Sequence, residues 1–213
     1  MRISKALLSL SALLLSARTV SATCPTSPLV LDLNGDGIQT TDLIYPVSFD
    51  INGDGAPELV AWTCGWTEEG FLWLDLNRNG TVDGGQELFG QGTLLPSGET
   101  AANGFEALKV YDGPSYGGNA DGVISEDDLI WSQLRLWVDR NHDGISQPQE
   151  ISTLRHFGVV AINLNFSRVQ EMDGNGNLHL LQSTYLKRVT ARGLGSRLVP
   201  YAVHDVFFQV GGD

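Results

Sequence analysis

The chain is poor in positive charge and in long apolar runs. It has 13 Lys and Arg residues against 25 Asp and Glu residues, which gives a formal net charge of −12 at pH 7. This balance disfavours nucleic acid and anionic membranes as partners, because both carry negative charge. Beyond an N-terminal segment, no run approaches the ~18 apolar residues that a membrane-spanning helix requires, so no transmembrane segment is predicted.

Catalytic signatures are also absent. The chain has no Gly-x-Ser-x-Gly elbow, no His-Glu-x-x-His metal motif and no phosphate-binding loop. Its four histidines, His142, His156, His179 and His204, are scattered along the sequence, which favours surface or hydrogen-bonded roles over ligation of a transition metal. No catalytic residue is therefore predicted, and we expect a protein that is not an enzyme.

The N-terminus has the pattern of a secretory signal peptide. A basic start precedes an apolar stretch at residues 6–15, and small residues at 20–22 provide a cleavage site. We therefore predict a signal peptide at residues 1–22 and one mature module at residues 23–213. The mature protein is expected to be secreted, or to reside in the periplasm or cell envelope.

Cysteine is scarce, with two residues, Cys24 and Cys64. An exported compartment is oxidising, so a disulfide between them is expected. This bond would tie the mature N-terminus to the segment around Trp62. The alternative is a lipid on Cys24, although Thr23 fits a lipoprotein cleavage site poorly.

The chain is rich in Asp, Asn and Gly, with 16, 11 and 25 residues. The pattern Asp-x-[Asp/Asn]-x-[Asp/Asn]-Gly begins at Asp32, Asp50, Asp75 and Asp139, whereas this composition predicts ~0.03 matches by chance. Side chains at positions 1, 3 and 5 and the backbone carbonyl at position 7 supply the oxygen ligands that Ca²⁺ prefers, and glycine at position 6 allows the turn. Mg²⁺ is less suited, because it retains several waters. The sequence therefore predicts several calcium sites.

The last of these loops is the most complete. Its predicted ligands are Asp139, Asn141, Asp143, the Ile145 carbonyl and Glu150, with the glutamate at position 12. An irregular partner loop lies upstream, with ligands predicted at Asn119, Asp121, the Val123 carbonyl and Asp128. Position 1 of this partner is Gly117, which has no side-chain oxygen. Asp112 is the alternative if residues 113–117 loop out.

Two helices are predicted beside this pair of loops. The first begins at Ser125, with Asp128 three residues later as in a capping box, and this capping role is the alternative to calcium ligation for Asp128. The second begins at Pro148 and ends at Gly158. Their apolar faces are Ile130, Leu134 and Trp137 in the first and Ile151, Leu154 and Phe157 in the second. A helix shared between two loops predicts an EF-hand-like helical pair.

The other three loops are predicted to lie next to strands. Their predicted ligands are Asp32, Asn34, Asp36 and the Ile38 carbonyl; Asp50, Asn52, Asp54, the Ala56 carbonyl and Glu58; and Asp75, Asn77, Asn79, the Thr81 carbonyl and Glu87. The first of them has Leu43 at position 12, so its remaining ligands have to come from Thr40, Asp42, water or elsewhere in the chain. The alternative is that it shares acids with the loop that begins at Asp50. Residues 173–177 lack the position-6 glycine and are predicted to form a hairpin turn.

Seven segments carry a family resemblance: residues 28–38, 65–66, 70–77, 87–90, 104–108, 134–139 and 205–208. In order and spacing they resemble the calcium-binding self-processing module of iron-regulated RTX proteins and related bacterial EF-hand-like proteins. The resemblance covers nearly all of residues 28–210 and implies calcium-dependent folding of a single β-rich module. In the self-processing members, calcium also triggers cleavage of an Asp-Pro bond immediately before the first strand.

The equivalent bond in this chain is Ser27-Pro28, and the sequence has no Asp-Pro dipeptide. Cleavage of this kind needs an aspartate carboxylate as the nucleophile, because a serine side chain cannot form the anhydride. We therefore expect no autocleavage.

Together these features predict an α+β fold: a β-rich single module with strand-borne Asp-rich calcium loops and an EF-hand-like helical pair. The expected function is that of a secreted calcium-binding protein whose folding is coupled to Ca²⁺. Its role would be structural, or it would bind an unknown extracellular or surface partner. The alternative is a calcium-dependent processing factor or hydrolase that acts on extracellular peptide or polysaccharide.

Overall fold

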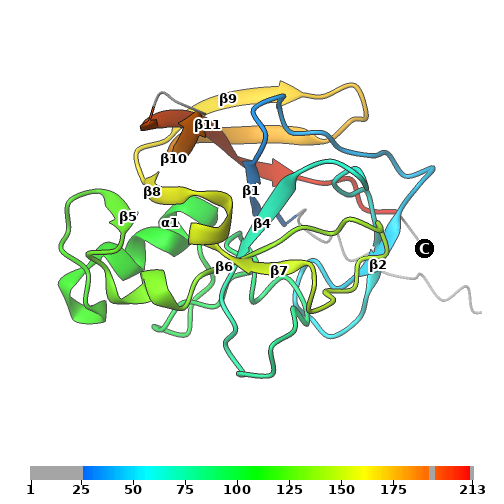
Figure 1. Cartoon of the computed structure of the whole chain (residues 1–213). Helices are drawn as coiled ribbons and strands as arrows, with labels where there is room; N and C mark the ends of the chain where they lie inside the picture. The colour runs from blue at the N-terminus through cyan, green and yellow to red at the C-terminus, as the bar shows by residue number, and fades with distance from the viewer. Residues whose placement is uncertain (1–25, 192–194, 212–213) are drawn as a thin grey trace, which may run out of the picture.

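A computed structural model describes residues 26–191 and 195–211 (Figure 1). The strands of the main sheet are β1 (Leu29–Asp32), β4 (Glu69–Trp73), β5 (Val123–Ser125), β6 (Arg135–Trp137), β7 (Ile151–Thr153), β8 (Val159–Asn163), β9 (Ser167–Met172), β10 (Leu178–Ala191) and β11 (Gly195–Phe207). A separate pair consists of β2 (Val47–Phe49) and β3 (Glu58–Val60). The predicted signal peptide lies outside the described residues.

The main sheet is antiparallel in every pair, in the order β5-β8-β10-β11-β1-β4-β6-β7. β9 pairs with the first part of β10, beside the segment that pairs with β8. The sheet curls, so that β9, β10 and β11 lie across the top of Figure 1 and β6 and β7 lie below them. The short strands β1, β4 and β6 therefore form the middle of the molecule.

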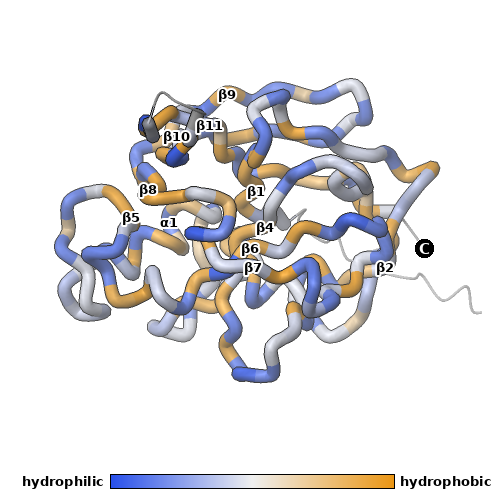
Figure 2. Tube along the Cα trace, in the orientation of Figure 1, coloured by the Kyte–Doolittle hydropathy of each residue, from blue (hydrophilic) through white to orange (hydrophobic). Residues whose placement is uncertain are grey.

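Both faces of the central strands are buried. β1 and β4 are buried at every residue, so alternate side chains enter two different cores. Leu31 and Leu72 face the core that contains the helix α1 (Gly104–Lys109), whereas Val30 and Phe71 face an aromatic core beside β2 and β3. Figure 2 shows apolar strands at the centre and polar loops around them. Burial on both faces explains why these strands are almost continuously apolar.

The helix α1 is short and leads directly into a loop. Its N-terminus is capped by Asn103, whose Oδ1 accepts a hydrogen bond from the Glu106 N–H at 2.9 Å. A 3₁₀ turn at Val110–Asp112 continues the chain. No helix in the described residues has the length and apolarity needed to cross a membrane.

The predicted EF-hand-like helical pair is wrong. The segment expected to form the first helix contains a 3₁₀ turn at Leu129–Ser132 and then β6. The segment expected to form the second contains β7 and a 3₁₀ turn at Leu154–Phe157. Gly158, with φ of 74°, ends this segment as expected, but it ends a 3₁₀ turn. The described chain is therefore mostly β-sheet, and not the α+β fold with paired helices that the sequence suggested.

Sheet pairing overrides the helical spacing of the apolar residues. Leu136 pairs with Leu72 of β4 and with Ser152 of β7, which makes β6 an internal strand. Leu134 and Trp137, which were expected on one helical face, lie in different cores. Successive side chains of a strand point to opposite faces, so a strand can fill both cores where an amphipathic helix cannot.

The predicted disulfide involves a residue outside the described part of the chain. Cys64 is half-buried, and its thiol donates a hydrogen bond to the Thr40 carbonyl at 2.8 Å. Cys24 lies outside the described residues, so the bond between them stays a prediction.

Candidate metal centres

Five loops share one backbone conformation. Each has an aspartate at position 1, namely Asp32, Asp50, Asp75, Asp112 and Asp139. The φ angle is positive at position 4, at Gly35, Gly53, Arg78, Ala120 and His142, and again at position 6, at Gly37, Gly55, Gly80, Gly122 and Gly144. Left-handed backbone at two alternate positions curls the chain around the first aspartate. Arg, Ala and His adopt this conformation against their own preference, so the loop geometry is imposed on them.

The position-1 carboxylate is held in the same way in all five loops. Its Oδ2 accepts a hydrogen bond from the N–H of the position-6 glycine at 2.8–3.0 Å. In four loops the position-3 amide oxygen accepts from the position-5 N–H at 2.8–3.1 Å. In four, the position-5 oxygen accepts from the position-7 N–H at 2.8–2.9 Å. Most of these oxygens accept a single hydrogen bond and retain a lone pair, whereas Asp139 Oδ2 and Asn79 Oδ1 each accept a second one. Every loop thus presents a set of candidate oxygen ligands.

Asp112, and not Gly117, begins the fourth loop along the chain. Its Oδ1 and Oδ2 accept hydrogen bonds from the N–H groups of Asp121 and Gly122 at 3.2 and 3.0 Å. The intervening residues form a separate 3₁₀ turn at Pro114–Tyr116. The looped-out arrangement is therefore confirmed, and Asp112 joins the candidate ligands.

Three loops end in a glutamate that is anchored in one common way. The position-2 N–H donates to the glutamate in each case: Ile51 to Glu58 at 3.2 Å, Leu76 to Glu87 at 3.0 Å and Arg140 to Glu150 at 2.9 Å. These glutamates occupy positions 9, 13 and 12, so three sequence spacings produce one arrangement. Glu87, a predicted ligand, thus contacts its own loop from position 13.

In two loops, side-chain amides donate hydrogen bonds to an acid of the same loop. In the third loop, the Nδ2 groups of Asn77 and Asn79 donate to Asp83 Oδ2 at 2.5 and 2.7 Å. In the last loop, Asn141 Nδ2 donates to Asp143 Oδ2 at 2.8 Å. Asp83, at position 9, thus joins the candidate ligands of the third loop.

The loop that begins at Asp50 brings three carboxylates into one cluster. One oxygen from each of Asp50, Asp54 and Glu58 lies within 4.8 Å of the others. Burial raises the pKa of Glu58, and the negative charges of Asp50 and Asp54 raise it further. Among the described residues, no Lys, Arg or His nitrogen lies within 4.0 Å of these carboxylates. A divalent cation would remove this repulsion.

The last loop is embedded in the aromatic core. The Trp62 Nε1–H donates to Asp139 Oδ2 at 3.0 Å, and the Trp137 Nε1–H donates to Glu150 Oε2 at 3.4 Å. Both carboxylates are buried: 2% of the surface of Asp139 and 3% of the surface of Glu150 is exposed. Burial raises the pKa of Asp139, and the charges of Glu150 and Asp143 add to the rise. An ion bound to these carboxylates would change the surroundings of two indole rings.

Asp128 makes the capping contact and still has a free oxygen. Its Oδ2 accepts a hydrogen bond from the Ser125 N–H at 2.8 Å. Its Oδ1 is buried and has no hydrogen-bond partner among the described residues. Burial raises the pKa of Asp128, and nearby Asp112 and Asp121 raise it further. Capping and metal ligation are therefore compatible roles for this side chain.

The loops are joined to one another and to the body. The Val82 N–H of the third loop donates to Ser146 Oγ of the last loop at 2.8 Å. His142, at a position that was not expected to bind metal, has its two ring nitrogens 2.9 Å from the carbonyl oxygens of Thr63 and Tyr45. A change in one loop can therefore reach its neighbours through direct contacts.

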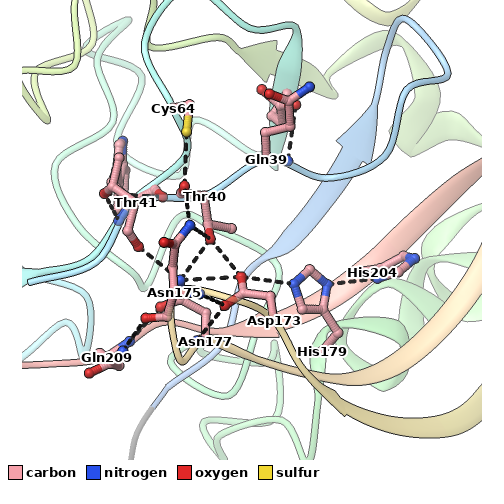
Figure 3. A network of polar contacts seen from close by, with 12 residues as sticks. Gln39, Thr40, Thr41, Cys64, Asp173, Asn175, Asn177, His179, His204 and Gln209 are labelled. Carbon is pink, nitrogen blue, oxygen red and sulfur yellow. Dashed lines mark hydrogen bonds and ion pairs between the residues drawn. The ribbon is translucent and has the colours of Figure 1, made fainter.

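A polar network holds the segment that follows the first loop (Figure 3). Thr40 Oγ1–H donates to Asp173 Oδ2 at 2.6 Å, and Asn177 Nδ2–H donates to Thr40 Oγ1 at 2.8 Å. His179 and His204 extend the network, with their Nδ1 atoms 2.8 Å apart. Burial alone would raise the pKa of Asp173, but hydrogen bonds from Thr40 and Asn177 lower it. The predicted hairpin turn is confirmed, since it joins β9 to β10, and the network anchors it.

The first loop receives no closing acid from its own sequence. Thr40 and Asp42, the candidates expected from the sequence, form hydrogen bonds elsewhere. The buried acid that lies opposite Asp32 across the β1–β4 pair is Glu69. Burial raises the pKa of Glu69 to about 7, and Asp36 and Asp32 contribute to the rise. Glu69 was missed because its place depends on strand register, which the loop pattern does not reveal.

Comparison with known proteins identifies the family of the chain. The SPM domain matches residues 29–193, which is more than half of the sequence. The chain belongs to the SPM domain family. A relative, the iron-regulated protein FrpA of Neisseria meningitidis serogroup C, is 38% identical over 162 residues. The aligned region is 75% of this chain but 14% of FrpA, so this SPM domain protein corresponds to a small part of that relative.

These matches fit the iron-regulated RTX-type family that the sequence resembles. The SPM region begins with β1 and contains all five loops. The side chains in these loops offer carboxylate and amide oxygens, and neither a thiol nor an imidazole is at a ligand position. This donor chemistry fits a hard cation such as Ca²⁺ and does not fit a soft transition metal.

Proposed function

We propose that this SPM domain protein binds several Ca²⁺ ions and that ion binding completes its folding. The observation that carries the proposal is the common geometry of the five loops, in which each position-1 carboxylate is fixed by the N–H of the position-6 glycine. Ca²⁺ takes six to eight oxygen ligands in flexible geometry, which loops of this kind supply from alternate residues and one carbonyl.

The charge balance explains why an ion would matter for folding. The ion pairs among the described residues are Lys109–Glu106, Arg155–Glu126 and His179–Asp173, and none of them includes a candidate ligand. Burial raises the pKa of one acid in or beside each loop: Glu69, Glu58, Glu87, Asp128 and Asp139. Repulsion and desolvation of these groups oppose folding, and a bound cation would offset both effects.

We propose that the protein binds these Ca²⁺ ions after it has been exported. The predicted signal peptide at residues 1–22 would direct the chain out of the cytoplasm. Calcium sites in extracellular modules work with dissociation constants of roughly 10⁻⁴–10⁻³ M, so weak loops would suffice there. The chain would then stay loosely folded until it reaches the compartment where calcium is abundant. Its role there would be structural or would involve a partner at the cell surface.

We also propose that the protein does not cleave itself. Ser27 precedes Pro28, and 3% of the surface of Ser27 is exposed. The Ser27 carbonyl packs so closely against Gly90 that an added Cβ there would lie 1.4 Å from the carbonyl oxygen. The bond is therefore held in the core, but a serine hydroxyl cannot form the anhydride that an aspartate would supply.

The test is a calcium titration of the exported protein after EDTA treatment, followed by tryptophan fluorescence and far-UV circular dichroism. A saturable gain of structure is expected, because Trp62 and Trp137 contact the ligands Asp139 and Glu150. Neither Mg²⁺ nor NaCl at equal ionic strength should reproduce it. A protein that is already folded in EDTA and does not respond to millimolar calcium would contradict the proposal.

Two variants sharpen this titration. Glu150→Gln removes a buried closing ligand and should raise the calcium midpoint about tenfold or more. Glu99→Gln makes the same change at an exposed site outside the loops and should leave the midpoint unchanged. Equal midpoints for both variants would exclude Glu150 as a ligand.

A further inference from the structure

Asp32 and Glu69 are an unusual pair of acids. They lie directly opposite each other in the antiparallel β1–β4 ladder, so their side chains are on the same face of the sheet. The two residues are buried, with 4% and 1% of their surface exposed. Like charges in directly opposite positions destabilise a strand pair, and burial increases the cost. Such a pair needs a bound proton or a positive partner.

No protein group in the described residues supplies that partner. The Asp32 oxygens accept hydrogen bonds from the N–H groups of Gly35 and Gly37 at 2.7 and 3.0 Å. Glu69 Oε1 accepts from the Gln39 N–H at 3.2 Å, but Oε2 is buried and has no hydrogen-bond partner among the described residues. No described Lys, Arg or His nitrogen lies within 4.0 Å of either carboxylate.

Lys187, a base close to the first loop, is engaged with other groups. Its Nζ donates to the Leu33 carbonyl and lies 5.2 Å from the centroid of the Tyr201 ring. The lysine therefore contacts the backbone of the loop and, among the ion pairs of the described residues, forms none with the two carboxylates.

We propose that Glu69 is the closing ligand of the first loop and that one Ca²⁺ ion bridges β1 and β4 there. The inference rests on the proposed function and deepens it. The site would consist of Asp32, Asn34, Asp36, the Ile38 carbonyl and Glu69. The free Glu69 Oε2 provides the carboxylate oxygen that the sequence of this loop lacks.

The backbone explains why this loop takes its acid from another strand. In three other loops the closing glutamate is anchored by the position-2 N–H. In the first loop, the position-2 residue is Leu33, and its N–H is already bonded to the Glu68 carbonyl at 2.8 Å. A glutamate from the same loop cannot use that anchor, and Glu69 is instead anchored by Gln39 at position 8.

The predicted consequence is a calcium ion that fastens two strands. The Asp32 carbonyl accepts a hydrogen bond from the Tyr185 hydroxyl at 2.6 Å, so the site also contacts β10. Loss of this ion should therefore loosen β1 against β4 and β10, and should leave the loop that begins at Asp139 able to bind its own ion.

The test follows backbone amides of two loops by ¹H–¹⁵N NMR during a calcium titration of the exported protein. Gly37 reports on the first loop and Gly144 on the last, because each donates to the position-1 carboxylate of its own loop. Glu69→Gln should raise the calcium concentration needed to shift Gly37 at least about tenfold and leave Gly144 unaffected. Glu68→Gln, an exposed neighbour with the same charge change, is the matched control and should alter neither signal.

The outcomes separate this inference from the proposed function. If neither glycine responds to calcium in the unmodified protein, the proposed function fails. If both respond and Glu69→Gln leaves the Gly37 midpoint unchanged, only the Glu69 inference fails. If Glu69→Gln does not fold, the ¹³C signal of the Glu69 carboxylate in the unmodified protein decides. It should shift with the same calcium midpoint as Gly37, and a constant signal would overturn the inference.

Discussion

Asp205→Asn is expected to stabilise the folded protein at neutral pH and to have little effect in acid. Asp205 lies on β11 opposite Leu29 of β1 and has 0% of its surface exposed. Its Oδ2 accepts a hydrogen bond from the Gly104 N–H at 3.2 Å, and its Oδ1 is buried without a partner among the described residues. Burial therefore raises the pKa of Asp205 to about 6.

The direction of the effect follows from proton binding. An aspartate in an unfolded chain has a pKa of about 3.9, so between about pH 4 and pH 6 the folded protein keeps a proton that the unfolded chain has lost. The protonated Asp205 side chain therefore contributes its full stabilisation of the folded protein below the unfolded pKa. This contribution is lost as the pH rises through the folded pKa. A shift of about two pH units corresponds to about 3 kcal/mol. Asparagine is neutral at every pH, and its oxygen can still accept the Gly104 hydrogen bond, so the variant avoids this loss.

Urea unfolding at saturating calcium, measured from about pH 4.5 to about pH 8, provides the assay. The variant should exceed the unmodified protein by up to about 3 kcal/mol at the alkaline end, and the difference should shrink towards acid. Glu171→Gln on the exposed strand β9 is the control and should change the free energy of unfolding by less than about 0.5 kcal/mol. A difference that is constant with pH, or a loss of stability at about pH 8, would refute the burial argument.

Two further substitutions test the loop geometry. Ala120 has φ of 58° at position 4, so Ala120→Gly should raise the free energy of unfolding by about 1 kcal/mol in urea or thermal melts; no gain would mean that this backbone is not strained. Asp112→Asn should raise the calcium concentration that shifts the Gly122 amide about tenfold or more, whereas Ser115→Ala in the looped-out turn should not. If both substitutions change this calcium concentration equally, Asp112 is not the position-1 ligand.

The local chemistry of the loops was predictable because it depends on short spacing. Asp139, Asn141 and Asp143 alternate along the chain, and alternation places their side chains on one side of a tight turn. The strand before the first loop was also visible, since an apolar run leads directly into Asp32. These features need no knowledge of distant contacts.

The errors arose where distant contacts decide. Trp137 was assigned to a helical face, but pairing of β6 with β4 and β7 turns it into the aromatic core. Glu69 enters the first loop only through the register of β1 and β4. Register is set by packing across the sheet, so a local pattern cannot reveal it. Asp112, by contrast, was an alternative that the sequence offered, and the 3₁₀ turn that follows it favours Asp112 over Gly117.

The placement of the loops suggests how ion binding and core formation depend on each other. β1, β4 and β6 are adjacent in the sheet, and each leads into the position-1 aspartate of a loop, at Asp32, Asp75 and Asp139. The same strands supply Leu31, Phe71 and other side chains to both cores.

β4 has a special place in this arrangement, because acids lie at both of its ends. If Glu69 at its start closes the first loop, Asp75 just beyond its end begins the third. The five residues of this fully buried strand would then be held by one cation at each end. Removing either ion would weaken this strand, so the first and third loops should lose calcium over the same concentration range, whereas the loop that begins at Asp139 should keep its own ion.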